Sequence, residues 1–132
     1  MNNQASLHKL IGKNLDYTYA CSSFIKRLFE ADKNLEQKSL QHIDHPFSRQ
    51  EMESWLDDQQ IKDEISLNKS LRKLRQQVIA NIILRDLNKL ADLKEVFLSV
   101  TTLAEITLIY AHQFHFNFLK TIHGSPIGLN GE

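Results

Sequence analysis

The sequence predicts an all-α fold, a helical bundle of four to five helices with two long antiparallel helices at its C-terminal end. Gly and Pro are scarce, at four and two of 132 residues, and no Asn-Gly or Asp-Gly turn lies between alternating strands. Apolar residues instead recur at spacings of three and four, which is the period of one helical face.

Composition and charge are those of an ordinary soluble domain. Apolar residues make up 42% of the chain, and 16 basic residues balance 16 acidic ones. The net charge therefore gives no reason to expect nucleic acid or a membrane surface as a partner. No signal peptide is apparent, and the longest apolar run, residues 78–84, is too short to span a bilayer. We expect one cytoplasmic helical domain or subdomain over 1–132, flexible at 1–14 and 124–132.

The first half of the chain predicts three helices. A helix over residues 16–30 has one apolar face, and a weaker helix follows over 33–41. The His-Pro step within 42–47 ends this second helix, because the residue before Pro avoids helical geometry. Ser48 then begins a short third helix, since Ser48 and Glu51 have the spacing of a capping box.

Two long helices follow. The first spans about residue 63 or 66 to 90, and in its later half the apolar stripe widens to more than one side. Asp92 begins the second, which runs to His123, and Glu95 stands at the capping-box position. The second helix carries an unbroken heptad that predicts a seam packed against the bundle. Its positions are Leu93, Phe97, Val100, Ala104, Thr107, Ala111, Phe114 and Phe118.

Four cations gather near the start of the first long helix, at Lys69, Arg72, Lys73 and Arg75. Cations at a helix N-terminus oppose the macrodipole, at a cost of about a few tenths of a kcal/mol each. They can pair with acidic residues of neighbouring helices, such as those at positions 53, 57 and 58. Alternatively they form a surface that faces a partner or a phosphate group.

No catalytic, cofactor-binding or metal-binding site is predicted. His112 and His115 lie three apart on one helix, and His42 and His45 flank a turn, but no further ligand accompanies either pair in a known zinc-binding frame. We interpret both pairs as surface or half-buried residues. Cys21 lies on an apolar helical face and is interpreted as a structural thiol. The sequence contains no nucleophile elbow, P-loop or dinucleotide-binding glycine motif.

The second half of the chain has an order of motifs that points to one family. It contains Leu71-Arg72-Lys73-Leu74-Arg75, then Arg85-Asp86-Leu87, Leu90-Ala91-Asp92-Leu93-Lys94-Glu95-Val96, Val100-Thr101-Thr102-Leu103-Ala104-Glu105 and Gly124-Ser125-Pro126. This order resembles the helical region that precedes the first nucleotidyltransferase domain of bifunctional glutamine synthetase adenylyltransferase/adenylyl-removing enzymes. The resemblance is good from about Leu67 to Glu132 and looser over 15–55. One departure is Asn81, which stands where Arg is common in the family.

The resemblance implies a parent enzyme of nitrogen regulation that adds AMP to a tyrosine of glutamine synthetase and removes it, using ATP and Mg²⁺. In that family the Gly-Thr-Pro loop is followed by a strand, a Gly-Met-Gly-Lys-Leu-Gly-Gly loop that handles phosphates, and paired aspartates that bind magnesium. Because this sequence ends at Glu132, before those motifs, we expect an N-terminal fragment that is inactive alone and holds no cofactor.

The expected partner of such a fragment is the catalytic domain of its own parent chain, and glutamine synthetase is reached through that parent. Phe114 and Phe118 are predicted to lie on the domain-packing face, and an uncovered apolar face would allow self-association. Neither nucleic acid nor a membrane is expected as a partner. The alternative is a stand-alone helical interaction module that uses the basic patch at positions 69–75.

Overall fold

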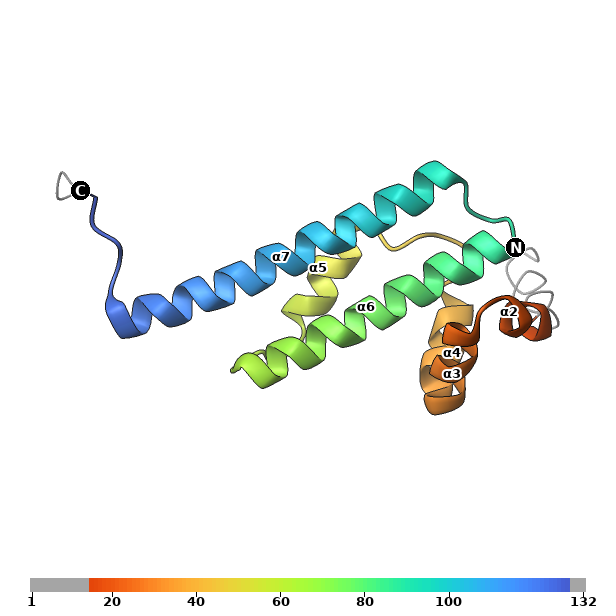
Figure 1. The fold of residues 1–132 in the computed structure, drawn as a ribbon, viewed down its shortest axis with the longest axis horizontal. Coiled ribbons are helices and arrows are strands. Elements are labelled where there is room, and N and C mark those ends of the chain that lie inside the picture. The colour runs from red at the N-terminus through yellow and green to blue at the C-terminus, as the bar shows by residue number, and fades with distance from the viewer. Residues whose placement is uncertain (1–14, 129–132) are drawn as a thin grey trace.

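The computed structural model describes residues 15–128, which form six helices and no strand. The predicted all-α class is therefore confirmed, and α6 and α7 are the two long antiparallel helices (Figure 1). The helices are α2 (Leu15–Cys21), α3 (Ser23–Ala31), α4 (Lys33–Gln41), α5 (Arg49–Asp57), α6 (Glu64–Leu87) and α7 (Leu93–His123).

Helix α6 is the central element, and it contributes to two hydrophobic clusters on different sides. Its Ala80 and Leu84 pack with α3, α4 and the following loop in a cluster that includes Phe29. Its Val78 and Leu74, among others, pack in a second cluster with α5 and α7. Figure 1 accordingly shows the short helices α2 to α4 near one end of α6, while α7 runs along α6 and the short α5 lies between these two helices. The predicted burial of α6 on more than one side is confirmed.

The predicted first helix over 16–30 is two helices, because Ser22 interrupts it. Ser22 has an extended backbone, and its hydroxyl accepts a hydrogen bond from the amide of Ile25, which makes it the N-cap of α3. Ser competes in this way with continued helical hydrogen bonding. Cys21, the last residue of α2, is exposed, so the interpretation of Cys21 as a structural thiol on an apolar face is wrong.

The later helix starts follow the capping signals. Ser48 and Glu51 form the predicted capping box of α5, with both reciprocal hydrogen bonds. Asp63 and Ser66 form another at the start of α6. Helix α6 ends at Leu87, three residues before the predicted end.

Helix α7 begins at the predicted cap, but its packed side is not the predicted heptad. Asp92 accepts a hydrogen bond from the amide of Glu95, whereas the carboxylate of Glu95 binds Arg85. The side of α7 that packs on the bundle consists of Val96, Ser99, Leu103, Ile106 and Tyr110. Each lies one residue before a heptad position, which is a rotation of about 100°.

The C-terminal end of α7 is at His123, and Gly124 follows with φ 76°. Residues 124–128 contain no helix. The flexible end predicted over 1–14 lies outside the described residues, as do residues 129–132 of the flexible end predicted over 124–132. None of the described helices is long and apolar enough to cross a membrane.

Candidate functional site

The loop between α4 and α5 is held in place by two buried polar residues of α6. Asn81 donates hydrogen bonds to the carbonyls of His42 and His45, at 3.1 and 3.2 Å. Arg85, one turn further along α6, donates to the carbonyl of Ile43 at 2.7 Å. Both side chains are almost wholly buried. Three carbonyls within four residues are therefore fixed by one face of one helix, which gives this loop a defined shape.

Arg85 also joins α6 to the start of α7. Its guanidinium binds both carboxylate oxygens of Glu95, at 3.0 and 2.8 Å. The same group donates to the carbonyl of Leu90 at 2.9 Å. The Arg-Asp-Leu step and the Asp-Leu-Lys-Glu start, which lie apart in the sequence, are thus linked by a bidentate ion pair. These two segments are part of the resemblance described above, and in the structure their ion pair fixes the end of α6 to the start of α7.

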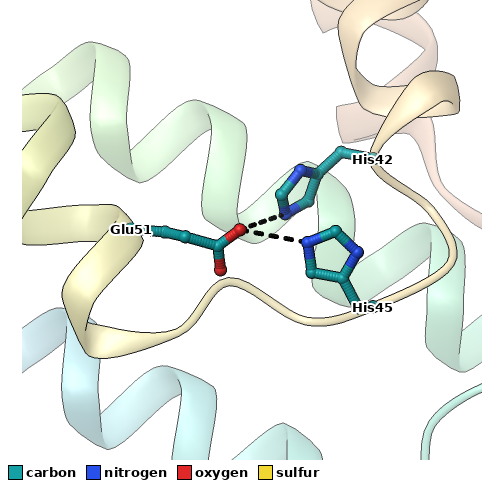
Figure 2. Close-up of side chains that lie close together, drawn as sticks. All are labelled: His42, His45 and Glu51. Atoms are coloured by element: carbon teal, nitrogen blue, oxygen red, sulfur yellow. Dashed lines mark hydrogen bonds and ion pairs between the residues drawn. The ribbon is translucent and has the colours of Figure 1, made fainter.

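The fixed loop brings two histidines next to a carboxylate of α5 (Figure 2). The Nε2 atom of His45 lies 3.0 Å from Oε1 of Glu51, and Nε2 of His42 lies 3.8 Å from the same oxygen. The other ring nitrogen of His45, Nδ1, lies 3.0 Å from Oδ1 of Asp44. The His42 ring stacks on Phe47 at a centroid distance of 4.0 Å. We call His42, His45 and Glu51 the His–His–Glu cluster.

The surroundings of the cluster shift the pKa values of its two histidines in opposite directions. The hydrogen bond with Glu51 raises the pKa of His45, and the hydrogen bond with Asp44 adds to this effect. Burial lowers the pKa of His42, and the neighbouring His45 lowers it further. Burial acts to raise the pKa of Glu51, but hydrogen bonds from Ser48 and His45 outweigh it, so the pKa is lowered. The arrangement favours a charged His45 between two carboxylates and a neutral His42.

The sequence patterns paired His42 with His45 but gave Glu51 only a capping role. Glu51 lies six residues after His45 and on helix α5, whereas both histidines lie in the preceding loop, so no standard spacing connects the three. His112 and His115 are both exposed on α7. Among the described residues, the His–His–Glu cluster is the one group of three potential metal ligands that lie together.

The four cations of the basic patch are all exposed on α6. The described ion pairs do not include Lys69, Arg72, Lys73 or Arg75. Two of the acidic residues considered as partners have other contacts, since Glu53 pairs with Arg49 and Asp57 accepts a hydrogen bond from Tyr110. The interpretation of internal pairing therefore has no support in the described contacts.

Helix α7 carries a second apolar stripe that the rest of the described chain does not cover. The positions fall within about 100° around the helix at 3.6 residues per turn. Phe118 is 53% exposed and Leu108 is 70% exposed, whereas Phe114 is half-buried. We call the stripe the outer face of α7, and it consists of Leu93, Phe97, Val100, Leu108, Phe118, Leu119 and Ile122. It includes half of the predicted heptad, which therefore lies on an uncovered side.

These features define an all-helical segment in which Asn81 and Arg85 of α6 hold the loop between α4 and α5 by hydrogen bonds. One apolar face of the segment, the outer face of α7, is not covered by the described residues. The chain belongs to the glutamate-ammonia ligase adenylyltransferase family, because the model of that family matches residues 12–132.

Relatives with a curated name agree with this assignment. Bifunctional glutamine synthetase adenylyltransferase/adenylyl-removing enzyme of Nitrosomonas eutropha is 38% identical over 111 residues, which cover 81% of this chain and 12% of the relative. The proteins of the same name from Nitrosomonas europaea and Chromobacterium violaceum are 38% and 37% identical, over 70% and 81% of this chain. The chain thus spans about an eighth of the length of these relatives. No solved structure gives a significant match.

Proposed function

We propose that this chain is a helical packing segment of a bifunctional glutamine synthetase adenylyltransferase/adenylyl-removing enzyme. Its role is to pack on the adjoining nucleotidyltransferase domain and to orient it. The family membership and the names of the relatives support this role. The chain itself performs neither adenylyl transfer nor adenylyl removal, and ATP and Mg²⁺ bind to the remainder of the enzyme. Glutamine synthetase is reached through that enzyme, in the cytoplasm.

The observation that carries the proposal is the outer face of α7. A row of exposed large apolar side chains along one side of a helix is costly in water and typically marks a surface that another protein covers. At about 1.5 Å per residue, the 31 residues of α7 extend roughly 46 Å, compared with roughly 36 Å for the 24 residues of α6. Figure 1 shows the C-terminal part of α7 projecting past the start of α6. The covering domain therefore contacts both the length of the outer face and this projection.

Complementation in trans tests the proposal. The Nitrosomonas eutropha relative is prepared without the segment that matches this chain, and the chain is then added as a separate protein. We expect the two to bind and adenylyl transfer to glutamine synthetase to increase. The variant Phe118→Glu places one negative charge on the outer face and is expected to weaken binding at least about tenfold, because a buried unpaired charge is costly.

The matched control is Gln113→Glu, which adds the same charge at an exposed position on the opposite side of α7. It is expected to leave binding unchanged. Binding that Gln113→Glu weakens as much as the outer-face variant would place the contact elsewhere. If the truncated relative retains full activity and does not bind the added chain, the proposed packing role is wrong.

A second candidate function rests on the exposed basic patch. In this alternative the chain is a stand-alone helical interaction module, and Lys69, Arg72, Lys73 and Arg75 bind an acidic partner. Such binding would weaken steeply with salt and would be lost in an Arg72→Glu, Arg75→Glu double variant. The same trans experiment separates the candidates, because this variant leaves the outer face of α7 intact and is expected to bind the truncated relative normally.

A further inference from the structure

The His–His–Glu cluster has the ligand types and spacing of a zinc site. Two imidazole nitrogens and one carboxylate oxygen form one of the ligand sets that hold Zn²⁺ in proteins, with a fourth position open to water. The three ligand atoms all lie within 4.8 Å of one another. Zinc–ligand bonds of about 2.0–2.1 Å in a tetrahedron place the ligand atoms about 3.3 Å apart. The distances of 3.0 and 3.8 Å from Glu51 to the two histidines lie on either side of that value.

The close approach of His45 to Glu51 requires either a proton or a metal ion on Nε2 of His45. With Nδ1 of His45 donating to Asp44, a neutral ring would turn the lone pair of Nε2 toward the Glu51 carboxylate 3.0 Å away. A proton on Nε2 or a metal ion removes this repulsion. The Asp44 contact also matches the carboxylate–histidine–metal arrangement, in which an outer carboxylate orients the ring of a ligating histidine.

His42 supplies an independent observation. Its Nε2 atom is buried and has no hydrogen-bond partner among the described residues, although it faces the Glu51 carboxylate at 3.8 Å. A buried ring nitrogen without a partner is uncommon, because the loss of its contact with water is not compensated. The ring itself lines a cavity with Lys38 and Phe47. A metal bonded to Nε2 would satisfy this atom.

Hydrogen bonds hold the backbone that carries the three ligands of the cluster, as a metal site requires. The carbonyls of both histidines are fixed by Asn81, and Glu51 lies in the capped first turn of α5. The backbone that carries the ligands is therefore positioned by hydrogen bonds of the fold and not by the ion alone. We propose that His42, His45 and Glu51 bind one Zn²⁺ ion, which joins the end of α4 to the start of α5. This inference is independent of the packing role of α7.

The experiment is calorimetric titration of the untagged 132-residue chain with Zn²⁺. We expect one ion per chain and a rise in Tm when the ion is added, because binding to the folded state stabilises it. His45→Gln and Glu51→Gln are each expected to weaken Zn²⁺ binding about tenfold or more. Glu51→Gln is the sharper variant, since Gln also serves in a capping box and the start of α5 is kept. Asp44→Asn is expected to cost about tenfold through the orientation of His45.

The control is His112→Gln, which removes an exposed histidine from α7 and should leave the Zn²⁺ affinity unchanged. Circular dichroism verifies that each variant is folded, and His45→Gln provides a second test at a half-exposed side chain. Zinc binding that survives both His45→Gln and Glu51→Gln, or that depends on His112, would overturn the proposal. The absence of any Tm shift with Zn²⁺ in the wild-type chain would overturn it as well.

Discussion

At the scale of single residues, Arg85 joins three separate segments of the chain through its guanidinium group. It binds the loop before α5, the turn before α7 and the first turn of α7 through Glu95. Its side chain is 8% exposed and that of Glu95 is 25% exposed. A buried ion pair contributes little net stability when it is complete, but the loss of one partner leaves the other charge without compensation.

We therefore predict that Arg85→Met destabilises the chain by about 3–5 kcal/mol, because Glu95 and two carbonyls lose their partner. Urea unfolding measures the change in the free energy of unfolding. Arg49→Met is the control, since Arg49 pairs with Glu53 and Glu105 on the surface and should cost about 0–1 kcal/mol. Equal losses in the two variants would contradict the role given to Arg85.

Tyr110 gives a prediction of pH dependence. Burial and the 2.5 Å hydrogen bond to Asp57 raise its pKa to about 12 from the ordinary value of 10.0. Between these values the unfolded chain loses the Tyr110 proton while the folded chain keeps it. This contribution to stability is fully present below about pH 10 and is lost as the pH rises to about 12.

Absorbance titration of tyrosinate should thus show one tyrosine that ionises after the others, and Tyr110→Phe should remove that last step. Tyr17→Phe is the control variant: the hydrogen bond with Cys21 also raises the pKa of this exposed tyrosine, but the last step should remain in this variant. A titration in which Tyr110→Phe removes an early step would show that the contact with Asp57 does not hold the proton.

At the scale of elements, the register of α7 is open to a direct test. Ile106→Ala is predicted to destabilise the chain by about 2–5 kcal/mol, because Ile106 is fully buried and a cavity would remain. Leu108→Ala lies two residues further on, where the side chain is 70% exposed, and should change stability by no more than about 0.5 kcal/mol. Thermal or urea unfolding compares the two. A larger loss of stability in Leu108→Ala than in Ile106→Ala would indicate that the outer face is the side of α7 that packs on the bundle.

The sequence predicted helix starts better than helix packing, and the reason is local. Ser48, Asp63 and Asp92 cap helices through hydrogen bonds within three residues, so the signal lies in the sequence itself. The register of α7 depends on which of two apolar stripes meets the bundle, and both stripes have helical spacing. The His–His–Glu cluster could not be predicted for a similar reason. It requires Asn81, 36 residues after His45, to fix the loop.

At the scale of the whole molecule, the outer face of α7 predicts concentration-dependent association of the isolated chain. Large apolar side chains along one helix bury area when two copies meet, so sedimentation should show dimers or larger species as concentration rises. Phe118→Glu should reduce this association, whereas Gln113→Glu should not. A chain that stays monomeric at all concentrations would contradict the prediction that the outer face binds a second copy of the chain.

The most direct test of the central claim is amide hydrogen exchange along α7, in the isolated chain and in its mixture with the truncated Nitrosomonas eutropha relative. The account predicts that exchange slows between Leu108 and Ile122 when the relative is present, because the covering domain suppresses local opening of the projecting helix. The Phe118→Glu variant should lose this protection. Identical exchange with and without the relative, in a chain that remains folded, would contradict the proposal that α7 packs on the rest of the enzyme.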